Sequence, residues 1–244
     1  MVGLGTLVNI AAIILGGLLG LLFGRSLSEQ KQDTLCRACG LCTLFIGISG
    51  ALQGMLTVED GVLAGDGTLK IVLCLSLGAL FGEILNIEDH IEDFGEWLKR
   101  RSGSGKDGQF VHAFVTASLT VCIGAMAVIG SIQDGIMGDP STLLTKSTLD
   151  LIIIMVMTSS MGKGCIFSAV PVALFQGSIT ALARLIEPVM TPAALADLSL
   201  IGSILIFCVG MNLVWGKQIR VGNLLPAIVL AVAFSYLPIA GYLA

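Results

Sequence analysis

Apolar runs of about twenty residues recur along the whole chain, and they constrain the fold more than any other feature of the sequence. As a helix, each run can cross a hydrocarbon core of roughly 30 Å, because an α-helix rises about 1.5 Å per residue. The runs do not alternate apolar with polar residues, as the strands of a membrane β-barrel do. With 55% hydrophobic and 12% charged residues, the chain also lacks the polar surface of a soluble domain. The sequence therefore predicts an all-α fold, a polytopic transmembrane helical bundle.

Eight apolar segments are expected to be helical, and the fifth is unusually short. Residues 148–160 would reach only about 20 Å, and the sequence MGKGC follows them. This segment is either a half-helix that breaks inside the membrane or the first part of one kinked helix that continues to Leu185, which would give seven spans. We prefer eight, because seven spans would place Lys217 and Arg220 outside the cell. The segments are 4–23, 35–56, 68–85, 110–129, 148–160, 165–185, 198–215 and 223–242.

Basic residues concentrate in alternate connections between these segments. Arg25, Lys31 and Arg37 lie in the first connection, and the basic residues of 99–106 lie in the third. The second connection carries acidic residues instead. Since cytoplasmic loops of membrane proteins are enriched in Lys and Arg, the odd-numbered connections are expected to be cytoplasmic. With eight spans, both termini are then outside.

The chain is expected to form a single integral membrane domain, residues 1–244, that contains parallel repeats of a helix pair. Gly-Thr-Leu at 5–7 and at 67–69 opens two apolar segments, and a G-x-x-Q motif closes the helix that follows each of them. Units separated by an even number of spans have the same orientation. The predicted repeat units are 4–56, 67–137 and 147–215, followed by a final helix at 223–242.

Residues 87–101 are predicted to form an amphipathic helix on the cytoplasmic face. Ile87, Ile91, Phe94 and Leu98 recur at helical spacing along one stripe. Acidic residues at its start and basic residues at its end complement the helix dipole. The helix is either an extension of the third span that lies on the cytoplasmic face or a surface that binds a partner or senses the membrane.

Glycines recur every four residues in two of the predicted spans. Gly16, Gly20 and Gly24 follow this spacing in the first span, and Gly78 and Gly82 follow it in the third. Small residues at this interval let helix backbones approach closely within a bilayer. We interpret them as packing faces, with a pore lining as the alternative.

Few polar residues are available for a path across the membrane. A charged side chain at the centre of a span costs about 2.5–3.5 kcal/mol, so those that are present are usually paired or in contact with water. The connection 133–146 is predicted to be a loop packed back against the bundle, with Asp134 or Asp139 near an outer mouth. A half-helix at 148–160 would bring Lys163 to polar groups of other spans, although Lys163 could instead lie at the cytoplasmic surface. The candidate pathway residues from these arguments are Asn9, Asp134, Asp139, Asp150, Ser159, Ser160, Lys163 and Asn223.

Other kinds of site are disfavoured. The motif CRACGLC lacks the fourth cysteine of an iron–sulfur run, and the two histidines, His90 and His112, have no partner at ligand spacing. We therefore expect no metal and no cofactor. No nucleophile motif such as G-x-S-x-G is present, so the chain is not expected to be an enzyme. A net charge of −4 makes nucleic acid an unsuitable partner.

Four stretches of the sequence resemble a known family. They are GTLVNIAAIILGGLLG at the start, SLGALFGEILNIEDHIEDFGEWLK, the long stretch from Phe114 to Asp150, and IRVGNLLPA near the end. Together they resemble the uncharacterised prokaryotic inner-membrane family typified by YqgA and YdfK, a domain of unknown function. The resemblance implies a multi-pass protein of the inner membrane with a transport role, but no substrate or mechanism. The family's polar signature corresponds here to Asn9, Gln133, Asp134, Asp139, Pro140, Lys146, Asp150 and Asn223, and this resemblance adds Gln133 and Lys146 to the candidate pathway residues.

These features predict a membrane transporter or channel for a small ion or a small polar solute. Acidic residues outnumber basic ones along the outer mouth, which favours a cation or a neutral solute. The alternative is an oligomeric structural or regulatory protein that acts through its cytoplasmic amphipathic helix. The expected partners are the lipid bilayer, the solute and further copies of the chain as a homo-oligomer.

Overall fold

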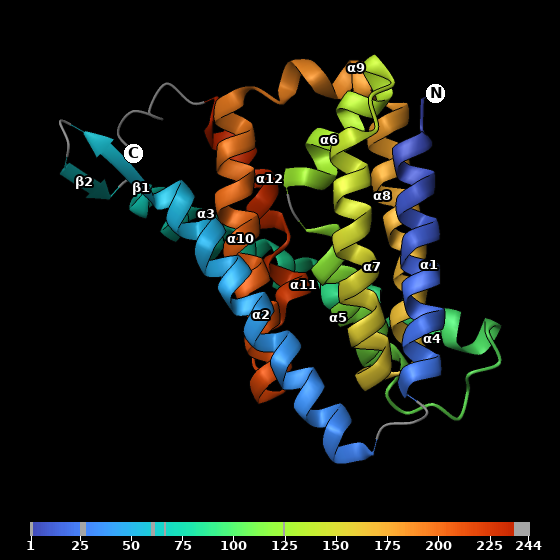
Figure 1. Ribbon diagram of the computed structural model, residues 1–244. Coiled ribbons are helices and arrows are strands. Elements are labelled where there is room, and N and C mark those ends of the chain that lie inside the picture. The colour runs from blue at the N-terminus through green and yellow to red at the C-terminus, as the bar shows by residue number, and fades with distance from the viewer. Residues whose placement is uncertain (1, 25–27, 60–61, 66, 124, 237–244) are drawn as a thin grey trace.

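The computed structural model describes residues 2–24, 28–59, 62–65, 67–123 and 125–236 (Figure 1). These residues are almost entirely helical, and their only sheet is the antiparallel hairpin of β1 (Leu56–Glu59) and β2 (Val62–Gly65). The prediction of an all-α fold is confirmed. The α-helices are α1 (Leu4–Gly24), α2 (Glu29–Met55), α3 (Thr68–Leu85), α4 (Ile87–Arg101), α5 (Phe110–Cys122), α6 (Ala125–Met137), α7 (Ser141–Met161), α8 (Ala169–Ala181), α9 (Ala183–Ile186), α10 (Pro192–Trp215), α11 (Val221–Leu224) and α12 (Pro226–Phe234), and the 3-10 helices are η1 (Lys163–Ser168) and η2 (Glu187–Val189).

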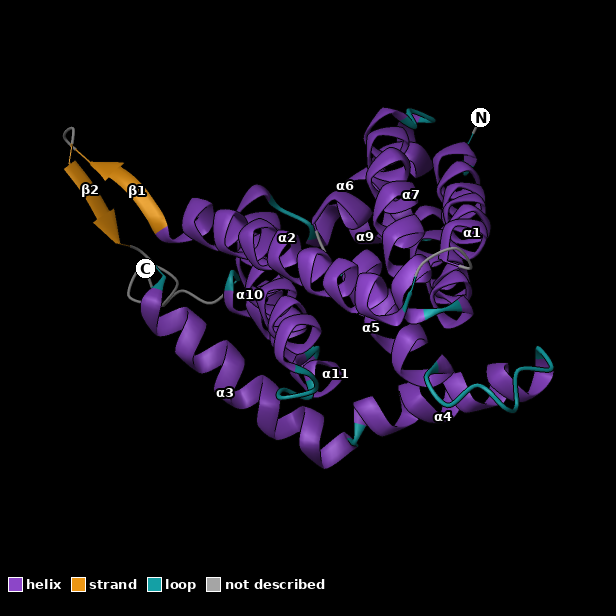
Figure 2. Ribbon diagram, turned by 60° about the horizontal axis from the view of Figure 1, so that its bottom comes forward, coloured by secondary structure: helices purple, strands orange, loops and turns teal. Residues whose placement is uncertain are grey.

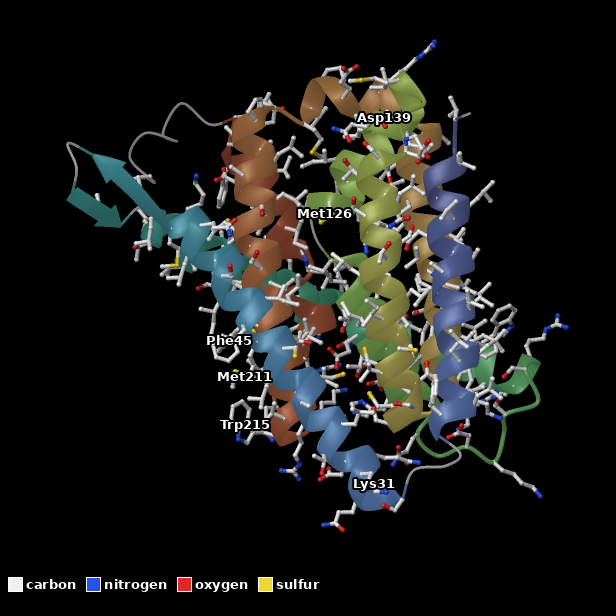
Figure 3. The ribbon with its side chains drawn as sticks, viewed as in Figure 1. Lys31, Phe45, Met126, Asp139, Met211 and Trp215 are labelled. Atoms are coloured by element: carbon white, nitrogen blue, oxygen red, sulfur yellow. The ribbon has the colours of Figure 1, made fainter. Side chains whose placement is uncertain are left out.

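Most long helices run between two ends of the molecule. Lys31 and Trp215 lie at one end, and Asp139 lies at the other (Figure 3). We call the first the basic end, because Lys217 and Arg220 follow Trp215 directly in the chain. We call the opposite one the Asp139 end.

The first group of helices packs around α1. A Cβ atom added to Gly16 would lie 2.4 Å from the carbonyl oxygen of Leu151, and one added to Gly20 would lie 2.3 Å from that of Met155. Both partners advance by four residues, so α1 and α7 run parallel and in backbone contact (Figure 1). In contrast, Thr6 contacts Thr180 and Asn9 contacts Gln176, so α8 runs antiparallel to α1.

The second group of helices is α2, α3, α10 and α12. Gly40 of α2 packs against Val214 and Gly54 packs against Leu200, which makes α2 and α10 antiparallel. Gly78 of α3 packs against Ala227 of α12. Figure 2 shows these helices beside the group that contains α1 and α7. The parallel repeat of helix pairs within the single domain stays a prediction.

The glycine faces are packing faces, as predicted. In α1, a Cβ added to Gly24 would lie 2.8 Å from the carbonyl oxygen of Ser159, which continues the contact of Gly16 and Gly20 with α7. In α3, a Cβ on Gly82 would lie 1.8 Å from the carbonyl oxygen of Asn223. No larger residue fits at these positions without separating the helices.

The polytopic character of the chain is confirmed by six helices within the described residues that are long and apolar enough to cross a membrane, α1, α2, α3, α7, η1 with α8, and α10. The pair α5 and α6 gives a seventh if it counts as one span, and residues Val221–Phe234 form a shorter apolar helix. The Tyr236 hydroxyl donates a hydrogen bond to the carbonyl of Val189, so the last described residue lies at the Asp139 end, as does the start of α1. The predicted final helix, 223–242, extends beyond the described residues.

The prediction of a short fifth segment was wrong. Residues 148–160 are the second part of α7, a full-length helix of 21 residues that begins at Ser141. The polar sequence from Ser141 to Ser147 was taken for a loop, but Lys146 and Ser147 are buried against other helices. Gly162, at φ 91°, ends α7, and the chain reverses into η1 and α8. The alternative of one kinked helix that continues to Leu185 is therefore wrong as well.

The interrupted segment is the fourth predicted one instead. The single helix predicted at 110–129 ends at Cys122, Ile123 is extended, and α6 continues at an angle of 62°. Because α6 extends to Met137, the predicted loop 133–146 reduces to a turn of three residues, 138–140. Gly138 in this turn has φ 65°, a conformation that glycine adopts without strain.

The amphipathic helix predicted at 87–101 is α4. It is separated from α3 by Asn86, whose left-handed conformation at φ 49° turns the chain, so α4 is not a continuation of the third span. Gly95 packs against Phe114 of α5, and the Phe94 ring lies 6.0 Å from the Phe114 ring. The exposed Trp97 stacks on Phe94. Figure 2 shows α4 lying across the bundle near the basic end.

Candidate functional site

Four polar side chains meet inside the first group of helices. They are Asn9 of α1, Lys146 and Asp150 of α7, and Gln176 of α8, and each is at most 8% exposed. We call these four residues the polar core. Asp150 is the tenth of the 21 residues of α7, so the polar core lies near the middle of a helix that is long enough to span a membrane.

Hydrogen bonds join the polar core across three helices. Asp150 Oδ2 accepts from Lys146 Nζ at 2.5 Å and from Asn9 Nδ2 at 3.0 Å. Asn9 Nδ2 also donates to Gln176 Oε1 at 3.2 Å. Charged and amide groups are costly to bury in a bilayer unless they are paired in this way. The arrangement therefore fixes α1, α7 and α8 relative to one another.

Lys146 also holds the break in the fourth predicted segment. Its Nζ donates to the backbone carbonyl of Val121 at 2.8 Å, near the end of α5. The last carbonyls of a helix have no partner within the helix and carry the negative end of its dipole. The ammonium group therefore satisfies a carbonyl that the break leaves free. The polar core and the broken helix form one structural unit.

Asp134 of α6 lies close to the polar core but is not bonded to it. Its Oδ2 accepts from the backbone N–H of Gly5 at 3.0 Å. Gly5 and Asn9 are one turn apart on α1, which is about 6 Å along the helix axis. Thr6 and Thr180 share a hydrogen bond of 3.3 Å at the same level of α1. Polar groups thus continue from the polar core toward the Asp139 end.

Several buried polar atoms in this region have no hydrogen-bond partner among the described residues. Two of them belong to the polar core, Asn9 Oδ1 and Gln176 Nε2. Two others are on α6, Ser131 Oγ and Asp134 Oδ1. Buried polar atoms in proteins nearly always have a partner, and where the protein supplies none the partner is usually water, an ion or a ligand. The region has the donors and acceptors of a binding site.

The other predicted pathway residues lie elsewhere. Gln133 accepts a hydrogen bond of 2.7 Å from Thr142 and so joins α6 to α7. Asp139 is exposed, and its Oδ1 accepts from the Ser141 N–H at 3.0 Å. This hydrogen bond lowers the pKa of the Asp139 carboxyl, which is therefore ionised at neutral pH. Neither residue joins the polar core.

Ser159, Ser160 and Lys163 lie at the basic end rather than at a break inside the membrane. Both serine hydroxyls donate to carbonyls of α7 itself, in its last turn. Lys163 is half-buried at the start of η1, where the chain reverses. Two locations were considered for Lys163, the cytoplasmic surface and a break inside the membrane. The structure agrees better with the first.

Asn223 belongs to a second polar cluster, at the basic end. Its Nδ2 donates to Glu83 Oε1 at 2.8 Å, and its Oδ1 accepts from the backbone N–H of Glu88 at 2.8 Å. Arg220 pairs with Glu83 at 3.0 Å and with Asp89. These contacts dock the start of α4 against α3 and α11.

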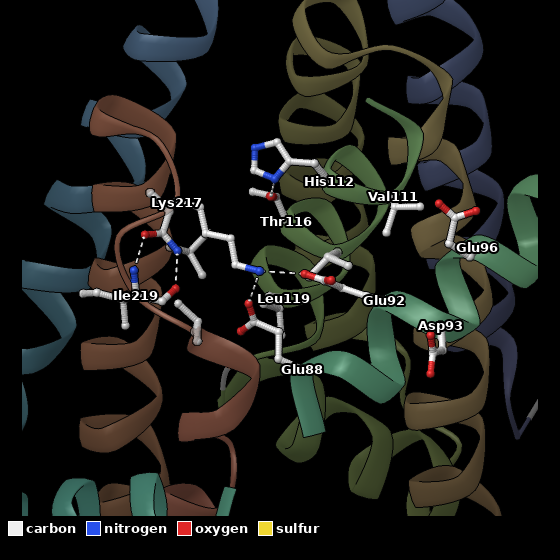
Figure 4. A pocket seen from close by; sticks show the side chains of 14 residues that line it. Glu88, Glu92, Asp93, Glu96, Val111, His112, Thr116, Leu119, Lys217 and Ile219 are labelled. Carbon is white, nitrogen blue, oxygen red and sulfur yellow. Dashed lines mark hydrogen bonds and ion pairs between the residues drawn. The ribbon is translucent and has the colours of Figure 1, made fainter. Parts of the chain in front are cut away.

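A cavity of about 450 Å³ opens beside this second cluster (Figure 4). Lys217 Nζ lies 2.6 Å from Glu88 Oε1 and 2.6 Å from Glu92 Oε1. Partial burial lowers the pKa of Lys217, but the hydrogen bonds to the two carboxylates outweigh this effect, so the pKa is raised above its ordinary value. The cavity extends past His112 and Thr116 of α5, and its lining residues are Glu88, Glu92, Asp93, Glu96, Val111, His112, Val115, Thr116, Leu119, Val209, Asn212, Lys217, Ile219 and Val221.

Glu88 should matter more for stability than Glu92, although both contact Lys217 at the same distance. Glu88 is buried and its Oε2 also accepts from the Gly222 N–H at 2.8 Å, whereas the Glu92 side chain is 41% exposed. We expect Glu88→Ala to lower the free energy of unfolding by about 1–3 kcal/mol, because it leaves buried groups without a partner. Glu92→Ala should cost about 0–1 kcal/mol. Denaturant unfolding in detergent micelles measures both, and equal losses would contradict the difference in burial.

Some residues of the candidate site were not predicted from the sequence. Gln176 stands alone among apolar residues in AVPVALFQGSITA and was a polar candidate within a predicted span, like Asn9, Asn212 and Asn223, but it was not assigned to the pathway. Ser131 and Thr180 gave no signal, since single hydroxyls are common in membrane helices. Lys70 and Asp197 form a largely buried ion pair of 2.7 Å between α3 and α10, but each lies near a predicted segment end, where charges are ordinary. Among the described residues, no group of three or more His, Cys, Asp or Glu side chains could hold a metal ion.

Comparison with known proteins places the chain in a family. Residues 4–236 match the family model described as "Protein of unknown function (DUF554)". The chain is 31% identical over 236 residues to the uncharacterized protein YqgA of Escherichia coli (strain K12), which covers 95% of this chain and 96% of YqgA. It is 28% identical over 226 residues to the uncharacterized membrane protein YdfK of Bacillus subtilis (strain 168), which covers 93% of each. No solved structure matches the chain. The chain therefore belongs to the DUF554 family, as the resemblance in its sequence indicates.

Proposed function

We propose that the protein is a transporter or channel that moves a small ion or a small polar solute across the inner membrane. The observation that carries this proposal is the polar core, in which a lysine and an aspartate are buried at the middle of a helix long enough to span a membrane. Charges inside a membrane protein are costly, and they commonly mark the paths of ions and solutes. Replacement of a buried ion pair by apolar residues is often neutral or stabilising, so stability alone is a weak reason for the pair to be present.

The break between α5 and α6 supports the same proposal. In many transporters the solute site lies beside an interrupted helix, whose free backbone groups face the solute. Here Lys146 contacts both the free carbonyl of Val121 and the carboxylate of Asp150. A solute that competes for Asp150 would release the ammonium group from its partner and so loosen the end of α5. The break then acts as a hinge that couples binding to a change in shape.

The path that we propose begins at the cavity near the basic end. The cavity reaches Leu119 of α5, two residues before the carbonyl that Lys146 binds. The polar core follows, and Asp134 continues the path toward the Asp139 end. By the preference of cytoplasmic loops for Lys and Arg, the basic end faces the cytoplasm, and the start of α1 lies on the outer side.

The alternative, an oligomeric regulatory protein that acts through α4, has less support. The acidic side of α4 pairs with Lys217 and Arg220 of the same chain. A partner that binds this side would first have to break these ion pairs.

Flux measured on purified protein in liposomes tests the proposed function. A panel of small ions and polar solutes is used, and we expect at least one to cross faster than in empty liposomes. Asp150→Asn should slow that flux about ten- to a hundredfold, because it weakens charge-assisted hydrogen bonds worth about 1.5–3 kcal/mol. Asp33→Asn, at an exposed aspartate that pairs with Arg37 near the basic end, is the matched control and should leave flux unchanged. If no solute crosses, or if both variants behave alike, the proposal is wrong.

A further inference from the structure

We infer that the polar core and Asp134 together bind one monovalent cation, a proton or an alkali metal ion, and that Lys146 sets how many cations the site takes. This inference rests on the proposed function and names the class of solute for the same site. Two observations carry it, the balance of buried charges and the set of oxygen atoms without a partner.

The buried charges of the site do not balance. Asp134 and Asp150 are 0% and 4% exposed, and Lys146 is 8% exposed. The two carboxylates and the one ammonium group leave one formal negative charge. An uncompensated charge is costly in a low-dielectric interior. One bound monovalent cation restores neutrality, whereas a divalent ion would leave an excess positive charge.

Among the described residues, the neighbouring elements supply no full positive charge to Asp134, which accepts only from the Gly5 N–H at the partly positive start of α1. Within their bounds, α1 and α8 contain no Asp, Glu, Lys or Arg. The Cys122 thiol of α5 is close to Lys146 and Asp150 and is neutral as a thiol. On α10, Asp197 is already paired with Lys70, and on α9 Arg184 is exposed. The negative charge therefore stays within the site.

Three oxygen atoms without a partner are available to a cation. Ser131 and Asp134 are three residues apart on α6, so their side chains lie on one face of that helix. Asn9 Oδ1 comes from α1, one turn from the backbone N–H that Asp134 binds. Oxygen ligands from carboxylates, amides and hydroxyls suit hard cations, and a carboxylate alone suits a proton. These three oxygen atoms do not make up the group of three or more His, Cys, Asp or Glu side chains that a divalent metal site typically uses.

In this scheme the ammonium group of Lys146 takes the place of a bound cation. This group already neutralises Asp150, at 2.5 Å. Removal of Lys146 should therefore create a demand for one more cation, and removal of the Asp134 charge should abolish the demand. Loss of both charges should restore the need for one cation. A purely structural role for these residues predicts no such pattern.

Cation binding to the full-length protein in detergent tests the inference without any transport. The thermal midpoint Tm is compared in choline chloride, whose cation is too large for a compact site, and in NaCl, KCl or LiCl at equal ionic strength. At saturation, one bound ion should raise Tm by about 5–10 °C. A pH series in choline chloride tests the proton in the same way. If the alkali metal salts raise Tm, binding of radioactive Na⁺ gives the number of bound ions. If only a change of pH shifts Tm, proton uptake on mixing gives that number.

Four proteins give the decisive pattern. The wild type should bind one cation, Asp134→Asn none, Lys146→Met two, and the double variant one again. Asn keeps an oxygen that accepts from the Gly5 N–H, so Asp134→Asn changes the charge with little change in shape. If Lys146→Met does not fold in choline, the wild type and Asp134→Asn decide alone. The inference is overturned if no cation or pH change shifts Tm of the wild type, or if Asp134→Asn keeps the full shift.

The two proposals can fail separately. Cation binding with the expected pattern but without flux of any solute would keep this inference and remove the proposed function. Flux of a neutral solute without any cation effect would keep the proposed function and remove this inference.

Discussion

Gly20→Leu should prevent α1 from packing against α7 and should lower the free energy of unfolding by more than about 3 kcal/mol. Even a single Cβ at this position would lie 2.3 Å from the carbonyl oxygen of Met155 and 2.8 Å from the Cβ of Thr158. The near atom is backbone, so it cannot turn aside as a flexible side chain could. The two helices would have to separate, and the hydrogen bond between Asn9 and Asp150 would be lost with them. The measurement is unfolding in detergent micelles, together with the yield of monodisperse protein.

Gly177→Leu is the matched control for this prediction. Gly177 lies in the apolar helix α8, and a Cβ added to it would meet nothing within 4 Å. The same change of residue in a comparable helix should therefore cost little, and the better helix propensity of leucine should offset part of any loss. If the two variants lose similar stability, close packing of α1 on α7 is not what Gly20 provides.

Lys146→Ala should have the second largest effect, a loss of about 3–5 kcal/mol when it is measured in choline chloride. The substitution leaves the Asp150 carboxylate without its ammonium partner and frees the carbonyl of Val121 at the end of α5. Both groups are then buried and poorly satisfied. Arg37→Ala, which removes an exposed ion pair with Asp33, should cost about 0–1 kcal/mol and is the control.

A double variant separates stability from function. Lys146→Met with Asp150→Leu replaces the buried pair by apolar side chains, and such replacements are often neutral or stabilising. We expect the double variant to recover most of the stability that Lys146→Ala loses, while flux through liposomes stays low. Recovery of both properties would mean that the pair is only structural. No recovery of stability would mean that Lys146 acts mainly through the carbonyl of Val121.

The sequence predicted the class of the fold well, because membrane helices leave a strong signal in hydropathy. The glycine faces and α4 were also predicted, since each follows from a short local period. The start of α7 was missed for an equally local reason. Thr142, Thr145 and Lys146 look like a loop when burial is judged from single residues, but tertiary contacts cover the lysine.

The candidate site could be predicted only in part. Asn9 and Asp150 were identified as polar residues within apolar segments, whereas Lys146 was identified only through the polar signature of the family. That they meet depends on the parallel packing of α1 and α7, which joins residues 141 positions apart, and no local pattern encodes such a contact. The break after Cys122 was not predicted either, because a glycine inside an apolar run is ordinary in a membrane helix.

The pairing of α1 with α7 has a consequence for how the protein is made. Asn9 of α1 is synthesised 141 residues before its partner Asp150 of α7. At about 5–20 residues per second, the wait is about 7–28 s. During this time the Asn9 amide lacks its Asp150 partner in the bilayer, and the glycine face of α1 is not yet packed against α7. Retention of α1 by the insertion machinery, rather than the speed of helix formation, should then limit how quickly the mature protein accumulates.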